Sequence, residues 1–376
     1  MRRREFFNTA GAAWGAALAG AAFAAQAPAT KEKKLEAGKT DDLRWHDIRG
    51  WGVEGKGWPD TERFYDRLPA RARGKVRPPV WDLSHHSAGM CVRFRTDATA
   101  LSARWTLLSP NLAMSHMPAS GVSGLDLYAE AEPGSWRWLG VGRPESAPQA
   151  RAQLAAGLPP GRRAFLLYLP LYNGVESVEI GLDPKASVEP LPARTTKPIV
   201  FYGSSIVQGG CASRPGMAHT AILGRRLDRA VINLGFSGNG TMDPEIAELM
   251  AELDPCAYVL DCLPNLGPAE VAQRTEPFVR TLRKSRPRAP IVLVEDRTFT
   301  NAALLPGLRS HHAANRAALR QTFDHLRAAG VEGLHYAPGD PLLGDDGEAT
   351  VDGSHPTDLG FLRMADALEP VLRPLT

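Results

Sequence analysis

The stretch PIVFYGSSIVQGG, residues 198–210, decides the fold that this sequence predicts. Its first five residues form a continuous apolar run, which is typical of a strand buried on both faces of a parallel sheet. Gly203-Ser204-Ser205-Ile206 follows directly, and glycine lets the chain turn sharply where such a strand ends. Because ligands bind beyond the carboxyl ends of the strands in open parallel sheets, a serine at this point lies where chemistry is expected.

Strands and helices alternate from this stretch to the C-terminus. The apolar runs predict further strands at 231–234, 257–263, 291–294 and 333–336, and the helical spacing predicts helices at 217–227, 244–253, 268–284, 311–329 and 358–372. This alternation favours a parallel sheet covered by helices on both faces, so residues 191–376 are predicted to form an α/β domain.

Upstream, residues 45–190 contain short alternating strands separated by turns. Glu132-Pro133-Gly134-Ser135 predicts one hairpin, Thr96–Thr99 a second, and Asn173-Gly174, the strongest of these turn signals, a third. A series of such strands is typical of an all-β sandwich or jelly roll, which we predict as an accessory domain.

The first 27 residues predict an export signal. Arg2-Arg3-Arg4-Glu5-Phe6-Phe7 is basic, the Ala/Gly-rich stretch to Ala25 is weakly apolar, and Ala22-Phe23-Ala24 offers a cleavage site. The paired arginines favour a signal peptide of the twin-arginine type at 1–27, followed by a polar linker at 28–44. The protein is therefore expected in the periplasm or outside the cell, with an uncleaved N-terminal anchor as the alternative.

Composition excludes several function classes. The whole chain has a net charge of +3, and removal of residues 1–27, with three arginines and one glutamate, would leave +1. No basic stretch interleaved with aromatic residues remains, so no nucleic-acid partner is expected. No later apolar run approaches the ~20 residues of a membrane span, so no stable membrane insertion is expected after cleavage. The four cysteines lack metal-ligand spacing, so no metal or other cofactor is predicted.

Four loops at the same edge of the predicted parallel sheet carry residues of the types that acyl transfer requires. Ser205 is the candidate nucleophile, His355 the base that takes its proton, and Asp352 the group that holds the imidazole ring. The backbone N–H groups of Ser205 and Gly238 and the side-chain amide of Asn265 would stabilise the oxyanion.

The same residues carry a family resemblance. Ser205, Gly238, Asn265 and His355 match in order the four residues that name the SGNH (GDSL-like) hydrolases. Gly203–Ile206 resembles the GDSL block with serine in place of its aspartate, 352–355 matches the D-x-x-H block, and 233–238 resembles the second block. The third block departs, because Asn265 lacks the usual preceding glycine and following aspartate. Residues 124–128, Gly-Leu-Asp-Leu-Tyr, resemble the GxDLY signature of a β-domain in one bacterial subgroup. The resemblance implies a three-layer α/β/α fold and ester hydrolysis, with acylated carbohydrate as a substrate.

Other interpretations of single residues stay open. Ser204 is a competing hydroxyl, and Glu295 and Arg297 at the end of a strand would either contact substrate or form a structural ion pair. The histidine pairs 85–86 and 311–312 are interpreted as surface residues, and Asp126 and Tyr128 as inter-domain contacts.

The sequence as a whole predicts an exported serine esterase that removes short acyl groups, acetyl above all, from a small-molecule or glycan ester. A lipase, thioesterase or acyltransferase on the same triad is an alternative, as is a catalytically inert carbohydrate-binding protein. The oligomeric state is not indicated by the sequence.

Overall fold

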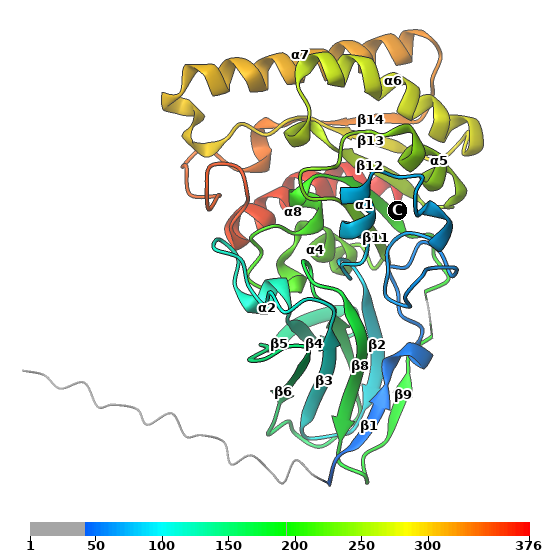
Figure 1. Cartoon of the computed structure of the whole chain (residues 1–376), viewed down its shortest axis with the longest axis vertical. Coiled ribbons are helices and arrows are strands. Elements are labelled where there is room, and N and C mark those ends of the chain that lie inside the picture. Colours follow the sequence, from blue (N-terminus) through cyan, green and yellow to red (C-terminus); the bar gives the residue numbers. More distant parts are fainter. Residues whose placement is uncertain (1–41, 193) are drawn as a thin grey trace, which may run out of the picture. The chain divides into compact units, whose positions relative to one another are not determined.

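A five-stranded parallel sheet forms the centre of the C-terminal half (Figure 1). The structure is a computed structural model that describes residues 42–376 except Ala193, so the predicted signal peptide and nearly all of the predicted linker lie outside the described residues. The strand order is β11-β10-β12-β13-β14, with bounds β10 Ile199–Gly203, β11 Val231–Gly235, β12 Ala257–Asp261, β13 Ile291–Val294 and β14 Leu334–Ala337.

Helices cover both faces of this sheet, as the alternation predicted. The helices are α3 (Ser205–Gln208), α4 (His219–Arg226), α5 (Pro244–Glu252), α6 (Pro268–Ser285), α7 (Pro306–Ala328) and α8 (Asp358–Leu372). Helices α5, α6 and α7 pack on one face and α4 and α8 on the other (Figure 1). The predicted three-layer α/β/α fold is therefore confirmed, although α7 begins five residues before its predicted start.

The register of the sheet aligns the ends of its central strands. Gly203, the last residue of β10, pairs with Gly235 of β11 and with Asp261 of β12. A Cβ atom on Gly203 would lie 2.1 Å from the carbonyl oxygen of Asp261, so only glycine fits at this position. The loops that follow these three strands consequently start at the same edge.

Two antiparallel sheets form the β-sandwich that the upstream half predicted. One has the order β1-β8-β3-β6 and the other β5-β4-β7-β2-β9. The strands are β1 Arg44–Asp47, β2 Cys91–Thr96, β3 Leu101–Leu107, β4 Leu125–Glu132, β5 Ser135–Gly142, β6 Gln149–Ala155, β7 Arg163–Tyr168, β8 Val175–Leu182 and β9 Val188–Pro190. Apolar residues of both sheets, among them Phe94, Leu127, Trp105 and Ile180, form one core between them.

Two of the three predicted hairpins are wrong. Strands β4 and β5 form a hairpin through the 132–135 turn, but β2 and β3 belong to different sheets, and so do β7 and β8. Asn173, in the second of these connections, is fully buried, and its side-chain amide donates to Ser109 O and Ser123 Oγ. The turn signal therefore marks a tightly anchored crossing between the sheets, because burial on the opposite sheet outweighs the local hairpin preference.

Part of the region predicted as β-sandwich packs against the α/β core. Residues 52–88 contain the short helix α1 (Pro78–Ser84), and Trp58 and Val80 pack in the same apolar cluster as Leu249 of α5. A second short helix, α2 (Ala119–Val122), precedes β4. The described cysteines, 91, 211, 256 and 262, are all free thiols.

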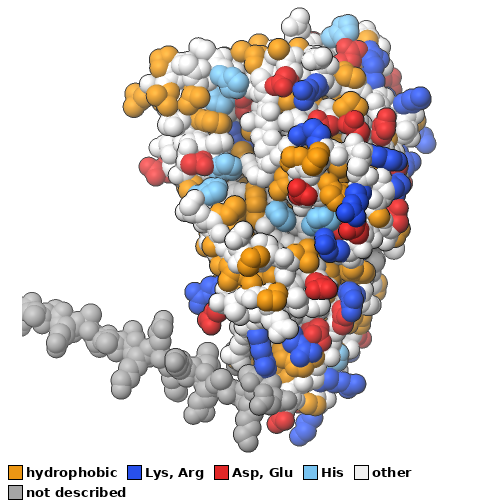
Figure 2. Space-filling model, in the orientation of Figure 1, with side chains coloured by type: hydrophobic (Ala, Val, Ile, Leu, Met, Phe, Trp, Pro, Cys, Tyr) orange, Lys and Arg blue, Asp and Glu red, His pale blue; other side chains and the backbone are white. Residues whose placement is uncertain are grey.

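Charge is mixed over the face shown in Figure 2, where acidic and basic side chains are interspersed. Among residues 42–376, none of the helices combines the length and the hydrophobicity that a membrane span requires.

Candidate active site

Ser205 occupies the first position of α3, directly after β10. Ser204 caps this helix, since its Oγ accepts a hydrogen bond from Ile206 N at 3.3 Å. Ser204 has no exposed surface, whereas the Oγ of Ser205 lies 2.8 Å from His355 Nε2. The two adjacent hydroxyls therefore differ in position: that of Ser204 caps the helix, and that of Ser205 faces the imidazole of His355.

His355 and Asp352 form a compact turn before α8. The Nδ1 atom of His355 lies 2.7 Å from Asp352 Oδ2, and the other carboxylate oxygen accepts from the backbone N–H groups of Ser354 at 3.0 Å and His355 at 2.8 Å. Partial burial by itself would raise the pKa of Asp352, but these hydrogen bonds outweigh it and lower the pKa. An ionised Asp352 therefore holds the ring with Nε2 directed at Ser205.

The loop after β11 carries Gly238, and its neighbour Ser237 is hydrogen-bonded to Gln208 of α3. Gly238 is exposed with φ +67°, and open space surrounds the position of a Cβ atom there. The neighbouring Gly240 is constrained, because its Cβ would lie 2.1 Å from Gly203 O. Gly240 N donates at 3.1 Å to Asn265 Oδ1. This bond orients the side-chain amide of Asn265, leaving its NH₂ group as the part directed away from Gly240.

A buried network that the sequence did not indicate fixes the spacing of these loops. Gln208 Oε1 accepts from Ser237 N at 3.0 Å, and its NH₂ group donates to Leu171 O and contacts His86 Nδ1 at 2.9 Å. Burial lowers the pKa of His86 to about 3, so its ring is neutral and can accept this hydrogen bond. His86 is therefore partly buried and hydrogen-bonded to the network, and not the surface residue that the sequence predicted.

Two arginines from residues 52–88 anchor β11 and the loop that follows it. Arg67 is buried and donates to the carbonyl oxygens of Asn233 at 3.1 Å and Gly235 at 2.6 Å. Arg77 donates to the side chain and carbonyl of Asn239 and to Asp243. Neither arginine stands in a motif, so no local sequence pattern identifies them.

Glu295 and Arg297, the two weaker candidates for substrate contact, have internal partners. Arg297 has no exposed surface and pairs with Asp261 at the end of β12. Glu295 accepts from Tyr336 Oη and from Gly339 N, both at 2.7 Å. This geometry favours the structural interpretation of the two residues. His312 is also buried, with Nδ1 2.7 Å from Asp296, which corrects its prediction as a surface residue.

The GxDLY stretch makes the predicted inter-domain contacts. Asp126 is fully buried and accepts from Arg214 Nη1 at 2.9 Å and Gly216 N at 2.8 Å, while Tyr128 Oη lies 2.5 Å from the same guanidinium. Arg214 and Gly216 follow α3 by a few residues, so these contacts join the β-sandwich to the segment directly after the helix that carries Ser205.

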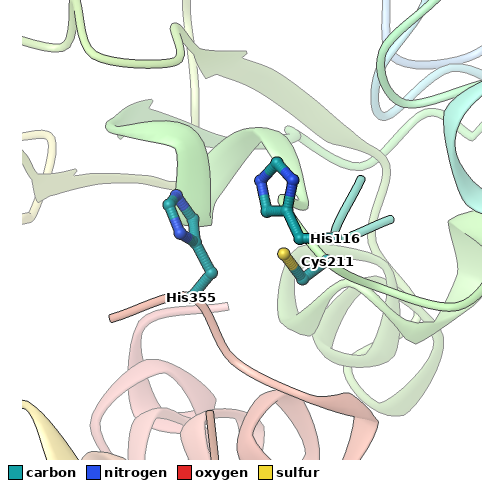
Figure 3. A group of neighbouring side chains, drawn as sticks. All are labelled: His116, Cys211 and His355. Atoms are coloured by element: carbon teal, nitrogen blue, oxygen red, sulfur yellow. The ribbon is translucent and has the colours of Figure 1, made fainter. Parts of the chain in front are cut away.

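Two further side chains surround His355. His116 extends from the β-sandwich segment between β3 and α2, and its ring packs edge-on against that of His355 with centroids 5.6 Å apart. Cys211 lies beside them (Figure 3) and is buried. Burial and the negative charge of Asp352 raise the pKa of Cys211 to about 12, so its thiol stays protonated at neutral pH. Residues 116 and 211 stand far apart in the sequence and form no motif.

The fold is that of an α/β/α hydrolase, and comparison with protein families gives its class. The profile of the GDSL-like lipase/acylhydrolase family matches residues 196–373, and that of the GxDLY domain, the N-terminus of SGNH-hydrolase-type esterases, matches residues 43–188. The chain belongs to the GDSL-like lipase/acylhydrolase family and is a carboxylic ester hydrolase.

Several solved structures are similar to this chain. A GDSL-like lipase from Bacteroides ovatus is 34% identical over 89% of this chain and 98% of its own, with a TM-score of 0.84. A salicylyl-acyltransferase from a tetracycline biosynthetic pathway (20% identity, TM-score 0.71) and a family two carbohydrate esterase from Cellvibrio japonicus (15%, 0.56) each cover the same shares and are similar in fold. A comparison with curated protein sequences gave no match.

Proposed function

We propose that this hydrolase uses Ser205, His355 and Asp352 as a catalytic triad. His355 Nε2 takes the proton of Ser205 Oγ as that oxygen attacks the ester carbonyl, and the imidazolium then protonates the departing alcohol. Water, activated by the same ring, hydrolyses the acyl-enzyme and releases the carboxylate. The observation that carries the proposal is the unbroken chain of contacts, 2.8 Å from Ser205 to His355 and 2.7 Å from His355 to Asp352.

In this proposal, the oxyanion of the tetrahedral intermediate receives three donors. These are the N–H groups of Ser205 and Gly238 and the NH₂ group of Asn265. The N-terminal position of Ser205 in α3 leaves its N–H without a partner inside the helix, and the helix end favours negative charge. The bond from Gly240 N to Asn265 Oδ1 supports the third donor by fixing which end of the amide faces the site.

For the substrate we propose a short acyl group, acetyl above all, on carbohydrate. The crowding of His355 by His116 and Cys211 favours a small acyl group, and the family two carbohydrate esterases, which share this fold, motivate the sugar. Export is part of the proposal and depends on the arginine-led N-terminus, so the enzyme would act on glycans outside the cytoplasm.

The triad is tested with a matched pair of serine variants. Ser205→Ala is expected to lose turnover of a short-chain aryl ester and covalent labelling by a fluorophosphonate, with an unchanged circular dichroism spectrum. Ser204→Ala removes only the helix cap, so it should still be labelled while losing about 1 kcal/mol of unfolding free energy. Labelling of Ser205→Ala at the wild-type rate would overturn the assignment.

The substrate is tested by acetate release from acetylated polysaccharides, together with a chain-length series of aryl esters. We expect the highest kcat/KM for acetyl esters. A preference for long chains would indicate a lipase, and acyl transfer to an added alcohol that outpaces hydrolysis would indicate an acyltransferase. Glycan binding without any ester turnover would indicate an inert binding protein.

A further inference from the structure

The cluster of His116, Cys211 and His355 has the composition of a metal site. One potential ligand atom from each residue, a ring nitrogen or the thiol sulfur, lies within 4.8 Å of the other two. In Figure 3 the three side chains come from separate segments and lie beside one another. Two imidazoles and one thiol are the donors that Zn²⁺ and chemically similar divalent ions prefer.

The distances suit a tetrahedral ion after small rotations. With bonds of about 2.0–2.3 Å, the ligand atoms around Zn²⁺ stand roughly 3.3–3.8 Å apart, so separations in the cluster must shorten by up to about 1.5 Å. His116 is exposed and lies outside any helix or strand, which allows its ring to turn inward. A water or a substrate oxygen would fill the fourth position.

The backbone at Cys211 places its sulfur at this point. Cys211 has φ +74°, in the left-handed region where a residue with a side chain is strained, and it directly follows Gly209 and Gly210. Glycine would adopt this conformation without strain. A cysteine held here directs a buried thiol toward the rings of two histidines, one from each domain.

We propose that His116, Cys211 and His355 bind a divalent transition-metal ion, Zn²⁺ or a close chemical equivalent, and that occupancy switches the hydrolase off. Binding releases the thiol proton and forms one sulfur–metal and two nitrogen–metal bonds. Both ring nitrogens of His355 already have partners, Ser205 at Nε2 and Asp352 at Nδ1. Whichever nitrogen binds the metal, one contact of the proposed triad is lost, so inhibition follows from geometry.

Binding itself is tested without any activity assay. Co²⁺ is titrated into the full chain, and the sulfur-to-cobalt charge-transfer band is recorded. We expect one equivalent to bind, and Cys211→Ser to remove the band. His116→Ala should weaken binding by ~10-fold or more. Cys256→Ser and His325→Ala, which change a distant half-buried thiol and an exposed imidazole on α7, should titrate like the wild type. Absence of the band in the wild type, or its persistence in Cys211→Ser, would overturn the site.

Inhibition is tested separately, and this part depends on the proposed function. Zn²⁺ should inhibit aryl-ester turnover by the wild type, and a chelator should restore it. The inhibition constant should rise by ~10-fold or more in His116→Ala and in Cys211→Ser. Equal inhibition of wild type and both variants would refute the switch. If the wild type shows no turnover, the proposed function fails, while the Co²⁺ titration of wild type and Ser205→Ala still decides whether the site exists.

Discussion

The Oε1 atom of Gln208 accepts a hydrogen bond from the N–H of Ser237 at 3.0 Å. This contact links the last residue of α3 to the residue before Gly238, so the spacing between two proposed oxyanion donors depends on one buried side chain. The NH₂ group of Gln208 is held in turn by Leu171 O and His86.

Replacement of Gln208 by leucine should therefore lower kcat more than it changes KM. The variant leaves the N–H of Ser237 and the carbonyl of Leu171 without partners, and each such buried group costs about 1–3 kcal/mol. We expect kcat to fall by ~10-fold or more as the loop shifts, measured on a short aryl ester. Gln321→Leu, an exposed glutamine on α7, is the control. A Gln208→Leu enzyme with wild-type kcat would show that the loop keeps its position without the link.

Asn265 allows the structural and the chemical role of one side chain to be separated. Asn265→Asp keeps the oxygen that accepts from Gly240 N but replaces the proposed oxyanion donor by a negative charge. Removing one such donor typically lowers kcat by about 10²–10³-fold, so we expect at least that loss with little change in Tm. Asn265→Ala removes both functions and should also lower Tm. A variant Asn265→Asp with kcat near wild type would exclude the amide from the oxyanion hole.

The ion pair of Asp126 and Arg214 should contribute strongly to stability because its carboxylate is fully buried. Arg214→Ala leaves that charge with only Gly216 N and Trp138 Nε1 as donors, and breaking a buried pair costs about 3–5 kcal/mol. Denaturant unfolding measures the loss. Arg226→Ala is the matched control, because its partners on α8 are partly exposed and such pairs contribute about 0–1 kcal/mol.

The loss in Arg214→Ala should also depend on pH. Burial raises the pKa of Asp126, while Arg214 opposes that rise. Without the arginine the carboxyl takes up a proton more readily, so the difference from wild type should shrink as the pH falls below neutrality. A loss equal to that of the control, or one that grows in acid, would contradict this account.

Sequence reasoning predicted most of the α/β half because its signals are local. An apolar run that ends in glycine, such as the one before Ser205, indicates a buried strand by its own residues alone. It can be recognised without knowing which distant residues the strand contacts. The crossing at Asn173 was missed because an Asn-Gly pair specifies a turn but not which sheet the next strand joins. Arg67, His86 and His116 act on the site through contacts with residues more than 100 positions away. Residues that meet in this way form no motif with a recognisable spacing in the sequence. Neither the loop network nor the proposed metal site could therefore be predicted from sequence.

His219 should make the protein sensitive to acid through its own burial. It lies in the core on α4, its ring stacks 5.7 Å from that of Phe361, and within the described residues neither ring nitrogen has a hydrogen-bond partner. Burial lowers its pKa to about 3 from an ordinary value of 6.5. The unfolded chain therefore binds a proton that the folded chain does not between these values. The contribution of neutral His219 to the unfolding free energy is fully present above pH 6.5. It is lost as the pH decreases toward 3, by up to about 1.4 kcal/mol per pH unit.

His219→Phe should flatten this dependence, because phenylalanine keeps the stacking and cannot be protonated. The unfolding free energy, measured by denaturant between pH 7.5 and 4.5, should fall less steeply in the variant than in the wild type. Part of the slope should remain, since His86 is also held neutral by burial. His325→Phe, on an exposed histidine, should leave the slope unchanged. If His219→Phe and the wild type lost stability in parallel, protonation of His219 would not be a cause of acid unfolding.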